Sequence, residues 1–259
     1  MKSIDRKALR DLWHVKGQAL AIAIVVAAGV GIFVAQFSTL ESLSLSRGGY
    51  YKKYRFGEVF AHCKRAPDAV KDQIADIPGV EQVQTRLIHD VSLDIEGQGE
   101  PAIGRLISVP DDRRPLMNDV HIRQGRYLEP GAKGEVLVGE AFAMAHRLEP
   151  GRELTAVING RRTQLKIVGI ALSPEYVYSI RAGDFFPDDK RFGIVWMEQR
   201  QMAAALGMRG AFNAVSLGIA RDASSPDVAQ RLDDVLSRYG SLGSIERKDQ
   251  TSHWYLENE

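Results

Sequence analysis

The longest hydrophobic stretch of the chain runs from Gly17 to Leu40 and contains no charged residue. At the helical rise, a segment of this length would reach about 36 Å, enough to cross a hydrocarbon core of roughly 30 Å. A cleaved secretory signal would have a shorter apolar core, of about 7 to 15 residues. The pattern therefore predicts an uncleaved transmembrane helix over 17–40, with a secretory signal as the less favoured interpretation.

Small residues recur at every fourth position of this stretch and form one stripe on the predicted helix: Ala19, Ala23, Ala27, Gly31 and Ala35. In lipid, close packing at such residues is a main cause of helix association. We therefore predict that the stripe packs against another transmembrane helix. A helix that only anchors the chain is the alternative, because Ala and Gly are common in membrane helices generally. Val26 lies off the stripe, so a bulkier side chain there is predicted to have only a mild effect on assembly or coupling.

Basic residues precede the hydrophobic stretch, and Asp5 and Asp11 are the acidic residues among them. Cytoplasmic flanks of membrane helices carry an excess of Lys and Arg, which predicts a cytoplasmic N-terminus and an extracytoplasmic main domain. Apolar residues at helical spacing also suggest that 1–16 lies as an amphipathic helix on membrane lipid; an ordinary basic flank is nearly as well supported. The residues predicted at this membrane surface are Lys2, Arg6, Lys7, Arg10, Trp13 and Lys16.

After a polar stalk over 41–56, two strand–helix–strand patterns stand near the two ends of the remaining chain. The first has strands at 58–64 and 80–95 around a helix at 67–77, and the second has strands at 214–220 and 244–247 around a helix at 226–239. Two such units can form a ferredoxin-like sandwich with two helices on one face of a sheet. We predict this split βαβ lobe from 57–99 and 207–250.

The segment between these units, 100–206, is predicted to be an inserted β-rich lobe. Its strands are expected at 120–122, 135–138, 154–158 and 164–170, its helices at 141–148 and 197–206, and an exposed or partner-covered loop at 185–187. Asn159-Gly160 is a strong hairpin signal because both central residues of the favoured turn need positive φ. The predicted fold class is thus α+β: a transmembrane helix followed by an extracytoplasmic domain, 57–259, with two lobes.

Composition and motifs exclude several function classes. A formal net charge of +1, from 34 basic and 33 acidic residues, argues against a nucleic-acid surface, which needs a basic face. One cysteine, Cys63, permits no intrachain disulfide. The chain lacks a phosphate-binding loop, a zinc-protease motif and a nucleophile elbow. We therefore predict no enzyme activity, no cofactor and no metal.

The histidines, the cysteine and the acidic pairs of the sequence are each interpreted as structural residues rather than as catalytic or metal-binding ones. Neighbouring residues on a strand point to opposite faces, so His62 and Cys63 do not suit a base and nucleophile pair, and Cys63 is predicted to be buried. The six histidines are scattered singly. Acidic pairs at 111–112 and 188–189 stand beside proline and are predicted to lie in solvated turns.

Five segments together resemble the FtsX-like, MacB-type permeases of ABC transporters with their periplasmic core domain. They are IADIPGVEQVQ (74–84), GRYLEPGAKGEVLVGEAFA (125–143), GRELTAVINGRRTQLKIVGIA (151–171), GAFNAVSLGIA (210–220) and YGSLGSIERKDQTSHWYLENE (239–259). These are patterns of strands and turns rather than chemical motifs, and they are more specific in combination than singly.

The resemblance implies a permease subunit in the bacterial inner membrane whose extracytoplasmic domain lies between the first two of four transmembrane helices. It implies a homodimer, a partner ATPase and an optional periplasmic adaptor, with the domain coupling helix motion to export or extraction of an envelope substrate. A second transmembrane helix would follow Glu259, so the chain is expected to be the N-terminal part of a longer permease. The substrate stays open. The alternative is a singly anchored binding or regulatory module, for example one that controls a cell-wall enzyme.

Overall fold

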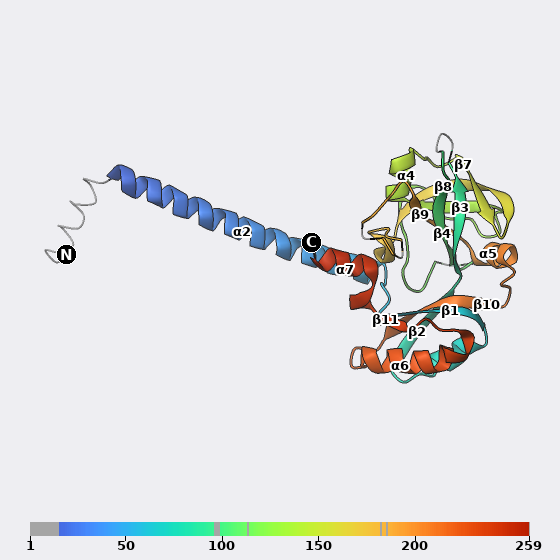
Figure 1. Ribbon diagram of the computed structural model, residues 1–259. Helices are drawn as coiled ribbons and strands as arrows, with labels where there is room; N and C mark the ends of the chain where they lie inside the picture. The colour runs from blue at the N-terminus through green and yellow to red at the C-terminus, as the bar shows by residue number, and fades with distance from the viewer. Residues whose placement is uncertain (1–15, 96–98, 113, 182, 185, 259) are drawn as a thin grey trace. The chain divides into compact units, whose positions relative to one another are not determined.

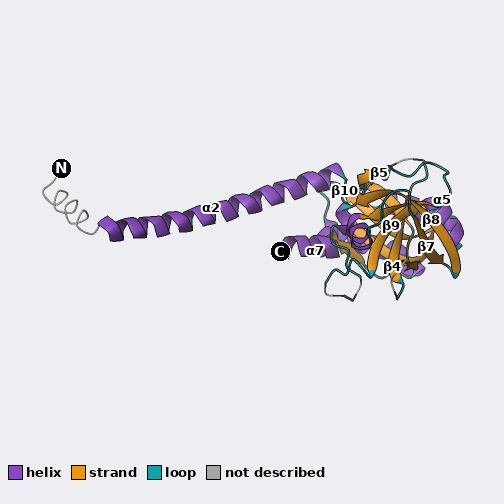
Figure 2. Ribbon diagram, turned by 90° about the horizontal axis from the view of Figure 1, so that it is seen from above, coloured by secondary structure: helices purple, strands orange, loops and turns teal. Residues whose placement is uncertain are grey.

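A computed structural model describes residues 16–95, 99–112, 114–181, 183–184 and 186–258. The chain divides into two compact units, an N-terminal unit of residues 1–50 and a C-terminal unit of residues 51–259. The described part of the N-terminal unit is helical, whereas in the C-terminal unit more residues lie in strands than in helices (Figure 2). A mixed α and β fold with an apolar N-terminal helix and a β-rich domain was predicted from the sequence and is confirmed.

Helix α2 (Lys16–Lys53) covers the predicted transmembrane segment and continues without a break through most of the predicted stalk. Among the residues that the structure describes, it is the one helix long and apolar enough to cross a membrane. Ala23, Ala27, Gly31 and Ala35 are exposed along it. Lys16 is its first residue, while Lys2, Arg6, Lys7, Arg10 and Trp13 lie outside the described residues.

The sheet lobe of the C-terminal unit is a four-stranded antiparallel sheet with two helices. Its strands are β1 (Val59–Pro67), β2 (Val80–Arg86), β10 (Ala211–Ile219) and β11 (Ser244–Glu246), in the order β11-β1-β10-β2. Helix α3 (Val70–Ala75) connects β1 to β2, and α6 (Ser225–Leu236) connects β10 to β11. Figure 1 shows α6 lying along one face of this sheet.

Alternation along the strands gives the sheet an apolar face and a polar face. Val59, Ala61 and Cys63 of β1 join one core cluster with Val215 and Leu217 of β10. The helices complete this cluster through Val70, Ile74, Val228, Leu232 and Leu236. Residues at the intervening positions point away from the helices, since successive side chains of a strand alternate. The helices therefore cover one face and leave the polar face for other contacts.

The barrel lobe contains the other seven strands. They are β3 (Ile88–Asp94), β4 (Ala102–Val109), β5 (His121–Gly125), β6 (Glu135–Gly139), β7 (Glu153–Ile158), β8 (Arg161–Leu172) and β9 (Phe192–Glu198), in the order β5-β8-β6-β9-β4-β3-β7. An additional pairing of β7 with β8 closes the strands into a barrel. The closed ring consists of β8, β6, β9, β4, β3 and β7, whereas β5 pairs with β8 alone and lies at an edge.

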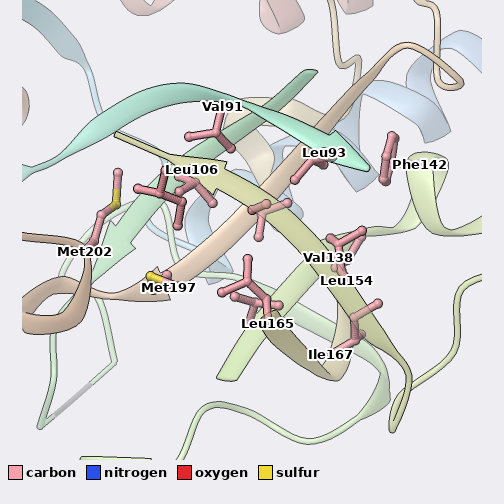
Figure 3. Packing of buried hydrophobic residues seen from close by; sticks show 14 of the residues in the cluster. Val91, Leu93, Leu106, Val138, Phe142, Leu154, Leu165, Ile167, Met197 and Met202 are labelled. Atoms are coloured by element: carbon pink, nitrogen blue, oxygen red, sulfur yellow. The ribbon is translucent and has the colours of Figure 1, made fainter. Parts of the chain in front are cut away.

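Interior side chains of the barrel form one apolar cluster that includes Leu93, Leu106, Leu154, Leu165 and Ile167. Two helices extend it: Phe142 comes from α4 (Glu140–His146) and Met202 from α5 (Gln199–Leu206). Figure 3 shows these two side chains on opposite sides of the labelled interior residues. The barrel is a packed core rather than a pore.

Several predicted boundaries were wrong. Pro67 ends β1 and does not begin a helix, because α3 begins at Val70. The single strand predicted over 80–95 is two strands in different sheets, separated at Leu87. The backbone N–H of Leu87 donates a hydrogen bond to the Ser108 hydroxyl at 2.8 Å. Met197 lies in β9 rather than in a helix.

The central parallel strands β4 and β9 were missed, because both are buried and show no alternation of apolar and polar residues. The Asn159-Gly160 hairpin is confirmed. Asn159 and Gly160 have φ of 50° and 75°, and they join the paired residues Ile158 and Arg161.

Replacing Gly193 by alanine is expected to lower the free energy of unfolding by about 1–3 kcal/mol. A Cβ there would lie 2.4 Å from the Phe142 ring, which is buried in the barrel core. Urea unfolding followed by circular dichroism measures the effect. Gly99→Ala is the control, because a Cβ at Gly99 meets nothing within 4 Å. Equal stability of the two variants would contradict this packing.

Candidate functional site

The two lobes of the C-terminal unit meet at the polar face of the sheet lobe. Cross-strand register places Phe60 opposite Ser216 and Ser216 opposite Gln84, while Ala214 lies between His62 and Arg86 in the next row. Directly opposed residues share a face of the sheet, so these polar side chains point together toward the barrel lobe.

Arg86 forms a buried ion pair with Glu175 across the lobes. Its Nη1 and Nη2 donate to the two carboxylate oxygens at 2.6 and 2.9 Å, and both residues are 5% exposed. Burial disfavours the charge on Arg86, but the Glu175 carboxylate raises the pKa of Arg86, so the guanidinium stays charged. A bidentate pair of this kind fixes the relative position of its two elements: β2 and the turn η1 (Pro174–Tyr176) after β8.

Hydrogen bonds continue from Arg86 to the start of the C-terminal unit. Arg86 Nη2 also donates to the hydroxyl of Ser216 at 2.9 Å, and Asn118 Nδ2 donates to the same oxygen at 3.1 Å. Asn118 Oδ1 in turn accepts from the backbone N–H of Gly57 at 2.8 Å. Buried polar groups that satisfy one another in this way rigidify and specify a site.

The C-terminal segment of the chain completes the connection. Gln250 Nε2 donates to the backbone carbonyl of Glu175 at 2.7 Å, and Gln250 Oε1 accepts from the N–H of His253 at 2.9 Å. His253 lies in helix α7 (Thr251–Asn258), and its Nδ1 is 3.0 Å from the hydroxyl of Tyr51. We call this set the polar ring: Tyr51, Gly57, Asn118, Ser216, Arg86, Glu175, Gln250 and His253.

Further contacts attach the C-terminal segment to the first residues of the same unit. Arg247 Nε donates to the carbonyl of Gly57 at 2.8 Å, and its guanidinium lies 5.3 Å from the centre of the Phe56 ring. Arg247 belongs to the turn η3 (Arg247–Asp249), which comes directly before Gln250. The segment that begins the C-terminal unit and the segment that ends it are therefore held together.

A small cavity of about 110 Å³ lies where the sheet lobe, the barrel lobe and the C-terminal segment meet. Its walls include Phe60 and His62 from β1, Tyr176 and Ile180 from the residues after β8, and Ser252 from α7. Partial burial, followed by the positive charge of Arg86, lowers the pKa of His62.

The reactive residues considered from the sequence do not gather into a catalytic site. Cys63 faces the apolar cluster under the helices, whereas His62 lines the cavity on the other face. Asp188 accepts hydrogen bonds from the backbone of the turn that follows it, as predicted. No group of three or more potential metal ligands occurs in the part of the chain that the structure describes.

Cys63 is expected to react with iodoacetamide at pH 8 at least a hundredfold more slowly than a free thiol. Burial raises the pKa of Cys63 to about 11, so the reactive thiolate is scarce at pH 8 and increases only as the pH approaches 11. Mass spectrometry of native and urea-unfolded protein measures the difference. Rapid labelling of the native protein would contradict this burial.

The polar ring was not predicted from the sequence. Its weak signal was the alternation in β2, where Gln84 and Arg86 occupy the face opposite Val83, but a polar strand face normally indicates solvent. Arg86 and Glu175 are 89 positions apart, and no local pattern connects them.

The C-terminal unit is similar to solved transporter domains. One is the periplasmic region of MacB from Actinobacillus actinomycetemcomitans, with a TM-score of 0.46, 11% identity, and coverage of 81% of this chain and 96% of that one. Another is the extracellular domain of the noncanonic ABC-type transporter YknZ from Gram-positive bacteria, with a TM-score of 0.45, 12% identity, and coverage of 73% of this chain and 99% of that one. No protein-family model and no curated protein matches the chain. The resemblance expected from the sequence names the same class of domain.

Proposed function

We propose that this chain is a permease subunit of an ABC transporter, or its N-terminal part. Its C-terminal unit would couple ATP-driven motion of transmembrane helices to export or extraction of an envelope substrate. Support comes from the five family-like segments, the basic flank before the apolar helix and the absence of catalytic motifs in the sequence. The ATP would be bound and hydrolysed by a separate ATPase.

The polar ring is the observation that carries this proposal. Tyr51, in the last turn of α2, contacts His253 of α7, so the segment that begins the unit is tied to the segment that ends it. Through Gln250 and Glu175 the same connection reaches both lobes. A movement applied to either segment would therefore reach both lobes. Packed side chains and hydrogen-bond networks of this type can carry energetic coupling between distant parts of a protein.

The finer organisation follows from the same proposal. The sheet lobe would be the ferredoxin-like lobe of 57–99 and 207–250, the barrel would be the insertion of 100–206, and 17–40 would span the bacterial inner membrane from a cytoplasmic 1–16. Two copies would assemble beside the ATPase, with membrane lipid around the helices and an optional periplasmic adaptor. The stripe of Ala19, Ala23, Ala27, Gly31 and Ala35 would pack against a neighbouring transmembrane helix.

Affinity purification of the tagged full chain from its native membrane tests the assignment. We expect an ABC-type ATPase to co-purify, and its ATP hydrolysis to fall severalfold when His253→Ala removes the contact with Tyr51. Trp254→Ala is the matched control, because Trp254 lies in the same helix and is about half exposed. Recovery of a cell-wall enzyme without any ATPase would favour the singly anchored regulatory module instead.

A further inference from the structure

The residues after β8 form a short segment, 173–180, that is held from two sides. Toward the sheet lobe, the Glu175 carboxylate binds Arg86. Toward the C-terminal segment, the Glu175 carbonyl accepts from Gln250 at 2.7 Å, and the N–H of Tyr178 donates to the Ser252 hydroxyl at 3.0 Å. We call this segment the strap.

The strap also forms one wall of the 110 Å³ cavity, which is partly open to solvent because Ile245 is 40% exposed. Tyr176, Tyr178 and Ile180 line it from the strap, and Phe60 and Ile245 line it from the sheet lobe. Well-packed interiors leave few voids larger than a water molecule, so a cavity under a short segment gives that segment room to move. Phe60 and Ile180, which are buried, would become more accessible if the strap lifted.

The Arg86 guanidinium is not fully paired within the described residues. Its Nε is buried and has no hydrogen-bond partner among the described residues, although both Nη atoms are paired. An unsatisfied buried donor carries a desolvation cost, which water would relieve if the strap moved. The closed arrangement is thus held by the ion pair and opposed by this unpaired group.

We propose that segment 173–180 is a strap that moves with the C-terminal segment to widen the cavity, and that the Arg86–Glu175 pair is the latch that holds the strap against the sheet lobe. The hydrogen bond that Gln250 donates to Glu175 and the one that Ser252 accepts from Tyr178 transmit the pull of the C-terminal segment to the strap. This inference rests on the proposed function for the source of the pull, but the latch itself does not depend on ATP.

Thiol labelling of the full chain in detergent tests the latch. Ile180→Cys places a reporter on the strap at a buried position beside the cavity, and the native Cys63 reports opening of the sheet lobe core. In the double variant Arg86→Gln and Glu175→Gln, which removes both charges together, we expect N-ethylmaleimide to label position 180 about tenfold faster. That ratio corresponds to about 1.4 kcal/mol in the opening equilibrium. Cys63 should stay protected.

The matched control is Arg126→Gln with Glu135→Gln, which removes an ion pair elsewhere in the barrel lobe and should leave labelling at position 180 unchanged. Unchanged labelling in the latch variant would overturn the proposal. So would equal acceleration at Cys63, because the pair would then stabilise the whole lobe. The effect of ATP and vanadate on the labelling rate at position 180, with the ATPase bound, is measured separately. If the latch variant labels faster but nucleotide has no effect, the latch stands and the proposed transport function fails.

Discussion

Replacing Arg86 alone by methionine is expected to lower the free energy of unfolding of the C-terminal unit by about 3–5 kcal/mol. The substitution leaves the Glu175 carboxylate buried without its bidentate partner. It also removes the hydrogen bond from Arg86 to Ser216. Urea unfolding followed by the fluorescence of Trp196, which is buried in the barrel lobe, measures the loss.

The double variant Arg86→Met and Glu175→Met is the control for this prediction. Replacing a buried ion pair by apolar residues of similar volume is often nearly neutral, because the desolvation of both charges disappears with their attraction. We therefore expect the double variant to be more stable than the single one. If Arg86→Met costs less than about 1 kcal/mol, the pair is solvated in solution and does not join the lobes.

Adding bulk to the small stripe of α2 is expected to reduce coupled ATP hydrolysis about tenfold without preventing membrane insertion. Gly31→Leu and Ala27→Leu would keep the apolar character of the helix but separate it from a neighbouring helix. Hydrolysis by the co-purified ATPase measures coupling, and carbonate extraction of membranes measures insertion.

Val25→Leu is a better control for the stripe than the same change at Val26. Val26 borders Ala23, Ala27 and Gly31 on one side of the helix, so it lies nearer to the stripe than Val25 does, and the mild effect of bulk at Val26 stays a prediction. Val25 is two positions before Ala27, which places it on nearly the opposite face at 100° per residue. Equal effects of Gly31→Leu and Val25→Leu would show that α2 is only a tether.

The local features of the fold could be predicted from the sequence where one residue type has one strong conformational preference. Asn159-Gly160 specifies its hairpin because both residues tolerate positive φ. The helix predicted over 226–239 corresponds to α6, whose buried residues Val228, Leu232 and Leu236 recur at helical spacing. The break at Leu87 could not be predicted in this way, since its cause is a hydrogen bond from Leu87 to Ser108, 21 positions later.

By itself, the sequence determined that an apolar helix precedes a larger β-rich domain, because exclusion of charge over 17–40 and alternation along strands are properties of neighbouring residues. The tertiary structure decided that the barrel closes through β7 and that Arg86, Glu175 and Gln250 form one connection. These features depend on residues that are far apart in the chain. Their hydrogen bonds stabilise the unit only after the lobes have packed, so no local pattern contains them.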